Sequence, residues 1–374
     1  MQKFDKTVLI FEPQISGHHL EYIHHIYTGA TKCPETKFII AVPERFTSVK
    51  DKFSWIEAEN IQIELLNNET LNNKLNIIRQ LIRLYNKFKP QEVFFITLMW
   101  LMPFLALFIF TPVKLSGIIY NIYLYGWKNS SIFSKAKNAL LYSLFTYCRC
   151  FKHIFILNDN SAVAVLNKVW HTNKYIYLPD PFVPIDCDQV RNLRSELNIN
   201  DKKIVYLHFG AMSERKGTLD IFNMVENTPS EQLSNYCLIF AGKIGNDIKQ
   251  QFYAYYEKWK NKIQIIIEDD FVDYERIGSY LITCDAVLLP YKYVNLSSGV
   301  IGYCAQFNKP AIATNKGLIG KLIRKNQLGL GINNYSSLSL KFSIINGSRY
   351  CQKRSIELFT STIVIADNNY ASHK

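Results

Sequence analysis

Short apolar runs and longer amphipathic stretches alternate along the whole chain. In the first half, five runs have the length and the β-branched and aromatic content of buried strands: residues 8–11, 38–42, 92–97, 118–124 and 153–158. Residues 20–30 and 71–88 have helical spacing instead. The apolar face of the second of these helices is predicted to consist of Leu71, Leu75, Ile78, Ile82 and Tyr85, flanked by Lys74, Arg79, Arg83, Lys87 and Lys89. This alternation predicts parallel strands joined by right-handed helical crossovers.

The second half repeats the same rhythm. Its predicted strands are residues 204–207, 237–241, 263–267, 286–289 and 311–314. Between the halves, the segment Leu178–Pro184 contains three prolines and is predicted to be a linker. Because single hydrophobic cores stop growing at about 250–300 residues, a chain of 374 residues is expected to form two domains. We predict domains at 1–180 and 181–347, followed by a tail at 348–374 that is helical up to residue 366.

Residues 93–113 contain no charged side chain over 21 positions, which is long enough to span a bilayer. Three interpretations are open: a transmembrane helix, a helix buried against the sheet, or a helix docked on a membrane surface. Trp100, the many Phe residues and the neighbouring basic helix favour docking. Because Thr97 and Pro103 interrupt the run, we expect a strand at Val93–Thr97 and a helix at Leu98–Phe110.

Residues 208–217 (HFGAMSERKG) follow a predicted strand and precede a helical pattern. Gly210 allows a tight turn directly after the strand. Arg215 offers a planar fork of donors and Lys216 a mobile point charge, which together suit a diphosphate. Gly217 stands where the next helix is expected to begin. A solvated basic loop is the alternative interpretation of this segment.

A second loop of this kind lies about eighty residues further on, at Ser297-Ser298-Gly299. It follows the strand that ends in Pro290-Tyr291 and precedes an apolar helical run that starts near Val300. A helix N-terminus exposes unpaired N–H groups, so it can bind phosphate, although an ordinary serine cap has the same sequence. Both loops follow predicted parallel strands, and ligands of open α/β sheets bind at that edge.

With these motifs the chain resembles the group 1 glycosyltransferases, a large family of retaining enzymes with the GT-B fold. The first motif matches at Gly210, Arg215, Lys216 and Gly217. The second motif matches at Asp285, Pro290, Tyr291, Ser298, Gly299, Ala305, Lys309, Pro310, Ile312, Ala313, Thr314 and Gly317. Gly17-His18-His19 and Leu178-Pro179-Asp180-Pro181 also fit. The resemblance is strong over about residues 200–332 and weaker before them.

The resemblance implies an α/β, GT-B architecture with two Rossmann-like domains whose parallel sheets face each other across a cleft. The N-terminal domain would bind the acceptor and the C-terminal domain the nucleotide sugar, with the tail crossing back to the N-terminal domain. Many members carry two glutamates seven residues apart, one for the sugar and one for the ribose. Here these positions hold Leu296 and Cys304. This chain must bind those hydroxyls otherwise, or it belongs to a divergent branch.

The expected donor is a nucleotide-diphosphate sugar of the UDP or GDP type. Arg215 and Lys216 would neutralise the leaving diphosphate, and Gly210, Ser297, Ser298 and the N–H groups of Gly299 and Val300 would surround it. By resemblance, the base would rest near Phe271 and Tyr274. Preorganised donors of this kind are worth about 3–4 kcal/mol each in barrier, so no metal cofactor is expected.

The N-terminal Gly17 would let the backbone approach the donor. His18 or His19 could hydrogen-bond the sugar or serve as a base in an inverting reaction, or both could be structural. The resemblance favours retention of configuration, with the departing phosphate taking the proton of the acceptor. Asp269-Asp270 could be offered as a metal pair, but adjacent side chains on a strand point to opposite faces. We therefore expect a charged strand end there.

The net charge is +12, and both halves are basic. This surplus suits a nucleotide diphosphate or an anionic membrane surface, and no nucleic-acid module is recognisable. None of the eight cysteines forms a Cys-x-x-Cys pair. The apolar run 8–11 is too short for the core of a signal peptide, so no signal peptide is expected. The expected location is the cytoplasm, peripheral to the inner face of the membrane.

The leading hypothesis is a glycosyltransferase that acts on a glycan or lipid-linked acceptor in surface polysaccharide assembly. The alternatives are a nucleotide-sugar epimerase on the same scaffold and a catalytically inactive GT-B-like binding subunit. An epimerase needs a cluster of acidic and basic groups that the sequence does not show. An inactive subunit has no need of Arg215 and Lys216.

Overall fold

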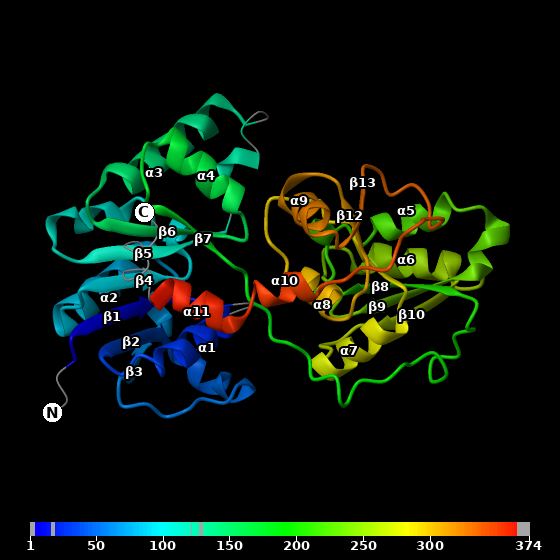
Figure 1. The fold of residues 1–374 in the computed structure, drawn as a ribbon, viewed down its shortest axis with the longest axis horizontal. Helices are drawn as coiled ribbons and strands as arrows, with labels where there is room; N and C mark the ends of the chain where they lie inside the picture. Colours follow the sequence, from blue (N-terminus) through cyan, green and yellow to red (C-terminus); the bar gives the residue numbers. More distant parts are fainter. Residues whose placement is uncertain (1–3, 16–18, 121, 126, 128–129, 365–374) are drawn as a thin grey trace. The chain divides into compact units, whose positions relative to one another are not determined.

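The computed structural model describes residues 4–15, 19–120, 122–125, 127 and 130–364. The described chain forms two compact units (Figure 1). The first unit contains the residues up to Asp180 together with those from Ile356 onward, and the second contains Pro181–Ser355. The chain therefore leaves the first unit once and returns to it near its end.

The first unit is built on a seven-stranded parallel sheet with the order β3-β2-β1-β4-β5-β6-β7. Its strands are β1 Lys6–Phe11, β2 Thr36–Pro43, β3 Ile61–Leu66, β4 Glu92–Phe95, β5 Lys114–Ile119, β6 Phe151–Leu157 and β7 Tyr175–Leu178. Its α-helices are α1 His19–Ala30, α2 Lys74–Phe88, α3 Ile132–Tyr147, α4 Asn160–Val169 and α11 Ile356–Val364.

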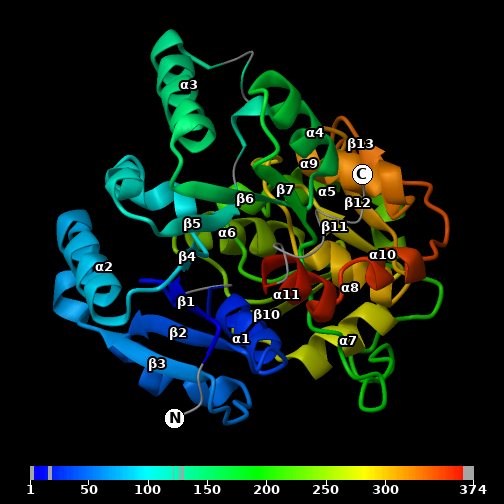
Figure 2. The ribbon, with the colours of Figure 1, turned by 60° about the vertical axis from the view of Figure 1, so that its left-hand side comes forward.

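Helices cover this sheet on both faces because both faces of its strands are apolar. Along β1, Leu9 and Phe11 join a core with α2, α3 and α4, whereas Val8 and Ile10 join a core with α1 and α11. Helix α11 lies beside α1 (Figures 1 and 2). The ring of the fully buried Phe359 of α11 lies 5.2 Å from that of Tyr22 of α1, measured between centroids, with the two rings tilted by 30°.

The second unit is built on a six-stranded parallel sheet with the order β10-β9-β8-β11-β12-β13. Its strands are β8 Ile204–Phe209, β9 Tyr236–Ala241, β10 Gln264–Glu268, β11 Ala286–Leu289, β12 Ala311–Thr314 and β13 Gly329–Ile332. Its α-helices are α5 Asp220–Glu226, α6 Lys249–Trp259, α7 Tyr274–Thr283, α8 Val300–Gln306, α9 Gly317–Asn326 and α10 Ser348–Gln352. Helices α5 and α6 share one core with the strand residues Tyr206, Leu238 and Phe240.

Several predicted strands need correction. Strand β5 ends at Ile119, so the prediction of a strand at 118–124 was shifted, and residues 123–125 form a 3-10 turn. The run at 153–158 was predicted to be the last strand of its half, but β7 follows it. The strands β3, β7 and β13 were not predicted, and all three lie at sheet edges. Edge strands are short or partly exposed, so their apolar signal is weak.

The uncharged run 93–113 does not form one continuous helix, and the helix predicted at Leu98–Phe110 is divided in two. After β4 the chain forms two 3-10 helices, η4 Leu98–Leu101 and η5 Phe104–Phe110, separated by Met102-Pro103. Leu98, Leu101, Leu105 and Phe108 are buried against the sheet. Among the described residues, no helix has the length and apolar character needed to cross a bilayer.

Helix α2 buries a different stripe from the one predicted. Its buried residues are Ile77, Ile78, Leu81 and Leu84. Leu75 and Ile82 were assigned to the packed face, but they are 51% and 42% exposed. The packed face is therefore rotated from the predicted one. It is centred on Ile77, Leu81 and Leu84, which leaves Leu75 and Ile82 at its outer side.

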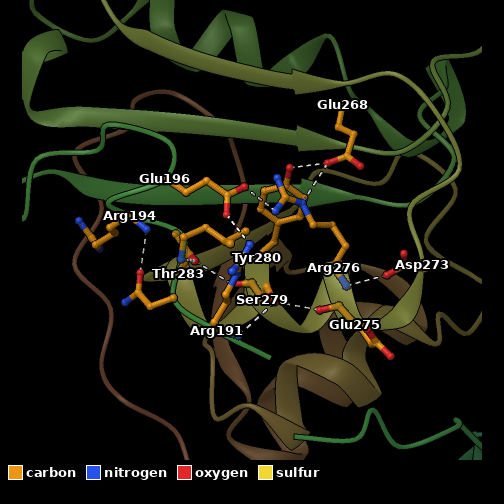
Figure 3. Close-up of polar contacts among 12 residues, drawn as sticks. Arg191, Arg194, Glu196, Glu268, Asp273, Glu275, Arg276, Ser279, Tyr280 and Thr283 are labelled. Atoms are coloured by element: carbon orange, nitrogen blue, oxygen red, sulfur yellow. Dashed lines mark hydrogen bonds and ion pairs between the residues drawn. The ribbon is translucent and has the colours of Figure 1, made fainter. Parts of the chain in front are cut away.

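A charged network ties the entry loop of the second unit to α7 (Figure 3). Arg276 donates to Glu196 at 2.8 Å and lies 3.5 Å from Glu268, while its guanidinium covers the Tyr280 ring at 5.0 Å. Arg194 pairs with Asp285 at 2.9 Å. These cations already have carboxylate partners, so this cluster stabilises the fold rather than offering an anion site.

Candidate functional site

The candidate site lies at the C-terminal edge of the second sheet, where β8, β9 and β11 end. Gly210 follows β8 with φ +87°, and Gly242 follows β9 with φ +136°. A Cβ at Gly242 would stand 2.4 Å from the carbonyl oxygen of Gly210, so the two loops pack backbone against backbone. A Cβ at Gly210 would stand 3.0 Å from Lys216 Nζ, so the lysine side chain reaches back over this turn.

The basic turn is fixed to the end of β11. Residues Glu214–Lys216 form a 3-10 turn that ends at Gly217, with φ +66°. A Cβ at Gly217 would stand 1.8 Å from the carbonyl oxygen of Pro290, which only glycine permits. The N–H of Lys292 donates to the carbonyl of Arg215 at 3.0 Å. The two motifs of the sequence are therefore joined through the backbone.

The cations at this edge differ in their partners. Lys292 pairs with Glu214, and its Nζ lies 3.8 Å from Asp220. Arg215 is exposed and Lys216 half-buried, and neither forms an ion pair with any residue that the structure describes. Lys216 Nζ lies 5.6 Å from the centroid of the Tyr291 ring. Two positive charges thus remain available at the sheet edge for an anion.

Tyr291 connects the basic turn to the serine loop. Its hydroxyl lies 3.3 Å from Ser298 Oγ, and its ring lies beneath Lys216. Helix α8 has only seven residues and begins at Val300, with Gly299 as N-cap residue. No atom lies within 4 Å of a Cβ built at Gly299, so open space adjoins this turn. Ser297 precedes it and is half-buried.

His208 supports the basic turn from below. It is fully buried, with Nδ1 2.9 Å from the carbonyl of Leu288 and Nε2 3.0 Å from the Thr218 hydroxyl. Because a carbonyl can only accept, Nδ1 carries the proton and Nε2 accepts from Thr218. Burial lowers the pKa of His208 to about 4, and the charge of Lys216 acts in the same direction. The imidazole is therefore neutral near pH 7.

The two positions that hold glutamate in many group 1 glycosyltransferases have no carboxylate here. Cys304 is fully buried in α8, and burial raises the pKa of its thiol well above the usual range. Leu296 is half-buried in the loop before Ser297. Neither side chain can accept hydrogen bonds from sugar hydroxyls as a carboxylate does.

The two aromatic residues expected near the base occupy the loop after β10 and the start of α7. Phe271 is 82% exposed, and Tyr274 is 41% exposed. The Tyr274 ring lies 6.1 Å from that of Tyr303, which in turn lies 6.3 Å from Phe209 at the end of β8. Aromatic packing therefore links Tyr274 to the sheet edge, and its role toward a base stays a prediction.

In the first unit, Gly17 and His18 lie outside the described residues. His19 is the first residue of α1 and is largely buried, with Nδ1 3.4 Å from Oε2 of Glu12. Glu12 is fully buried after β1. Burial raises the pKa of its carboxyl, although His19 and the N–H of Gln14 oppose the shift. Whether His19 contacts a substrate stays a prediction.

Asp269 and Asp270 do not converge on a common point. Asp269 accepts from Lys249 Nζ and from the N–H of Ile244, both at 2.8 Å. Asp270 accepts from the N–H of Phe271. Among the described residues, no group of three or more His, Cys, Asp or Glu side chains is placed to hold a metal.

Sequence reasoning missed part of this arrangement. His208 is the first residue of the first motif and Thr218 directly follows it, but the sequence does not show that their side chains bond to each other beneath the basic turn. Gly242 directly follows a predicted strand, a signal that could have been used. A hollow of about 490 Å³ in the first unit, lined in part by Arg45 and Trp100, was also missed because its walls come from four separate loops.

No protein-family model matches the chain, and no curated protein sequence matches it. Solved structures do resemble it. HepE of Anabaena, in complex with UDP, has a TM-score of 0.68 at 13% identity, over 96% of this chain and 99% of that chain. The same protein in complex with UDP-glucose has a TM-score of 0.60.

Two other solved structures are similar over nearly the whole chain. WaaG, a glycosyltransferase involved in lipopolysaccharide biosynthesis, has a TM-score of 0.59 at 12% identity, covering 96% of this chain and 92% of that chain. A glycosyltransferase from Rickettsia africae ESF-5 has a TM-score of 0.58 at 17% identity, covering 97% and 92%. Identities this low establish the fold alone. The predicted GT-B fold, with two Rossmann-like domains built on parallel sheets, is confirmed.

Proposed function

We propose that the protein is a glycosyltransferase that uses a nucleotide-diphosphate sugar as donor. The observation that carries this proposal is the pair Arg215 and Lys216, which form no ion pair among the described residues. Lys216 is also joined to Ser298 through Tyr291. Two cations and a hydroxyl at the C-terminal edge of a parallel sheet suit a diphosphate. The similarity to HepE, which was crystallised with UDP and UDP-glucose, supports a donor of this class.

The proposed reaction transfers the sugar with retention of configuration. The bond between the sugar C1 and the diphosphate oxygen breaks, and a bond from C1 to an acceptor hydroxyl oxygen forms. The proton of that hydroxyl passes to the departing phosphate. Lys216 and Arg215 stabilise the negative charge that develops on the diphosphate, each by about 3–4 kcal/mol. The proposal includes no divalent metal, so EDTA is expected to leave turnover unchanged.

The acceptor in this proposal is a glycan or lipid-linked saccharide of surface polysaccharide biosynthesis. The similarity to WaaG, involved in lipopolysaccharide biosynthesis, supports this class of acceptor. The first unit would hold the acceptor and the second the donor. If the reaction instead inverts configuration, His18 or His19 is the candidate base.

Isothermal titration calorimetry with UDP and GDP tests the donor site. We expect the protein to bind at least one of them and Lys216→Ala to lose at least ten-fold in affinity. If the protein binds neither nucleotide, the proposal fails, and an inactive binding subunit becomes the better description. Incubation with nucleotide sugars, without acceptor, then distinguishes a transferase from an epimerase, because only an epimerase converts the donor sugar to its epimer.

We further propose that the protein associates with the inner face of the membrane through its first unit. Helices α2, η5 and α3 all pack on the same face of the first sheet. None of the three contains an acidic residue. Their outward residues include apolar side chains and cations: Leu75, Ile82, Phe110, Ile132, Phe133, Lys74, Arg79, Arg83, Lys135 and Lys137. Most residues in the first half of α3 are exposed, and Figure 2 shows this helix projecting from the first sheet. A cationic surface with exposed aromatics suits an anionic bilayer.

Sedimentation with anionic liposomes tests membrane association. Replacing Lys74, Arg79 and Arg83 by Gln is expected to lower partitioning roughly 100-fold, since each charge is worth about 1 kcal/mol at such a surface. Lys87 is left in place because it pairs with Glu64 at 3.0 Å. The control replaces Lys249 and Lys258 of α6 and Lys260, the residue directly after α6, by Gln. It removes the same number of positive charges from the second unit. Membrane association is wrong if the unmodified protein does not sediment with the liposomes.

A further inference from the structure

We propose that the hollow in the first unit binds a sugar ring that carries an acidic substituent, as the receiving end of the acceptor. This inference rests on the proposed transferase function and names the substrate class of its acceptor site. The hollow has a volume of about 490 Å³, enough for a monosaccharide. It lies at the C-terminal ends of the parallel strands, the edge at which ligands of open α/β sheets bind.

The walls of the hollow come from the loops that follow four strands, and these strands are neighbours in the sheet order β3-β2-β1-β4. Pro13 and Gln14 follow β1, and Arg45 belongs to the 3-10 turn after β2. Asn68 and Asn72 stand between β3 and α2, and Trp100 stands in η4 after β4. Residues spread over almost ninety positions of sequence therefore converge on one space.

The lining combines one large aromatic face with planar polar groups. Trp100 is half-buried and lines the hollow. A sugar ring has an apolar face of C–H groups that can lie on such a ring, and a rim of hydroxyls that need donors and acceptors. Gln14, Asn68 and Asn72 supply three amides for that rim. Asn68 Oδ1 is shielded from solvent and accepts no hydrogen bond from any residue in the described ranges.

The charge of the hollow is positive. Arg45 is exposed and forms no ion pair with a described residue, and none of the lining residues is acidic. The adjacent Glu44 is turned toward the loop after β3, where its Oε2 lies 3.4 Å from the N–H of Asn68. Lys74 Nζ lies over the Trp100 ring at 5.7 Å and adds a second cation near the rim. A guanidinium with free donors selects a carboxylate or a phosphate.

The loops that line the hollow are held in place by hydrogen bonds behind them. The buried Glu12 accepts from the N–H of Gln14 at 2.8 Å. Asn67 Oδ1 accepts from the N–H of Glu69 at 2.9 Å, and Gln80 of α2 accepts from the N–H of Asn67 at 3.0 Å. The site is thus preformed in the described chain, which lowers the ordering cost of binding.

Ligand-observed NMR titration of the full chain tests the inference with glucose, glucuronate, glucose 6-phosphate and inorganic phosphate. We expect at least one of the two acidic sugars to bind at least five-fold more tightly than glucose. The difference between glucuronate and glucose 6-phosphate identifies the acidic group. Arg45→Gln should bring the acidic sugars to the affinity of glucose, and Trp100→Ala should weaken all three sugars. Arg79→Gln, on the outer face of α2, is the charge-matched control and should leave all four ligand titrations unchanged.

Three outcomes would overturn the inference. Equal affinity for glucose and both acidic sugars would show that the hollow does not recognise an acidic substituent. If inorganic phosphate bound as tightly as glucose 6-phosphate, the hollow would not recognise the sugar ring. Unchanged titrations in Arg45→Gln would place the ligand elsewhere. Trp100→Phe keeps an aromatic face, so it separates loss of the sugar platform from misfolding. A parallel UDP titration reports on the second unit, so failure of the acceptor site and failure of the proposed function are distinguishable.

Discussion

Lys216 is the single residue on which the proposed chemistry depends most. Its ammonium has no carboxylate partner among the described residues, and it lies over the Tyr291 ring. We expect Lys216→Ala to reduce turnover by at least a hundred-fold, because a charge aimed at the leaving group is worth about 3–4 kcal/mol. The free energy of unfolding should fall by less than about 1 kcal/mol, since only a cation–π contact is lost. Turnover assays and thermal melts measure the two effects.

The control for this variant is Lys258→Ala. Lys258 pairs with Glu226 at 2.6 Å on the exposed side of α6, so its loss removes one positive charge without touching the candidate site. Its turnover should equal that of the unmodified protein. A large drop in melting temperature for Lys216→Ala would show that the lysine is structural and would contradict the proposed role.

His208 gives the second unit a specific dependence of stability on pH. Burial lowers the pKa of His208 to about 4, and its unfolded value is 6.5. The unfolded state therefore takes up a proton first as the pH falls. The neutral folded form is favoured above pH 6.5, and that stability is lost progressively between pH 6.5 and about 4. The loss approaches about 3 kcal/mol at about 1.4 kcal/mol per pKa unit.

The measurement is the free energy of unfolding of the second unit at pH 7 and pH 4.5. Between pH 7 and pH 4.5, the fall in the free energy of unfolding should be about 2–3 kcal/mol smaller for His208→Gln than for the unmodified protein. Comparison with the variant cancels the other groups that titrate in this range. The exposed His171→Gln, in the first unit, should leave the difference unchanged. Equal pH dependence in the His208 variant and the unmodified protein would contradict the buried neutral imidazole.

At the residue scale, the order of strands and loops in the sequence predicted that the two motifs lie at one edge of the sheet. Gly210, Lys216 and Ser298 were expected near one anion, and the structure joins the two motifs through Tyr291. The sequence could not predict that Glu214 pairs with Lys292 rather than with Arg215, because ion pairing depends on the direction of side chains across a loop. Nor could it predict which wall Trp100 would line.

At the element scale, the turn after β8 and the end of β11 act as one piece through Gly217. We expect Gly217→Ala to lower the free energy of unfolding of the second unit by about 3 kcal/mol or more. Its φ of +66° is costly for alanine, and the new Cβ would press into the Pro290 carbonyl at 1.8 Å. Denaturant unfolding of the second unit measures this loss.

Gly299→Ala is the matched control for that variant. Gly299 has ordinary helical angles, with φ −58°, and its Cβ would meet nothing within 4 Å. Its unfolding free energy should stay within about 0.5 kcal/mol of the unmodified protein. If Gly217→Ala is equally mild, the turn can shift away from β11, and the close packing of the two motifs is not required.

The sequence predicted the bounds of fully buried strands correctly. It failed for elements whose form depends on their position in the sheet or on a neighbouring proline. Strands β11 and β12 have the predicted bounds because they are central and apolar throughout. Strand β3 (IQIELL) was missed because it lies at the edge and exposes Ile63 and Leu65. The hydrophobic pattern of the run 98–110 predicted one helix, but Pro103 divides the run into the two 3-10 helices η4 and η5.

At the scale of the whole molecule, the chain forms two units that are each continuous except for α11. That helix follows the second unit in sequence but packs in the first, where Phe359 and Thr360 are buried. Thr360 fits against Gly29 of α1, where a Cβ would stand 2.4 Å from that of Thr360. Helix α11 is therefore part of the core that contains Val8 and Ile10 of β1.

Phe359→Ala is expected to destabilise the first unit and leave the second unchanged. Phe359 is fully buried in the core that contains α1, and removing a buried phenylalanine costs about 3–5 kcal/mol. Differential scanning calorimetry should show one transition moving down and the other staying in place, provided that the units unfold separately. Leu358→Ala, at a position 41% exposed on the same helix, should move neither. Because UDP is proposed to bind the second unit, Phe359→Ala should also retain its affinity for UDP. If both transition temperatures fell equally, α11 would stabilise the two units together, and the prediction would be wrong.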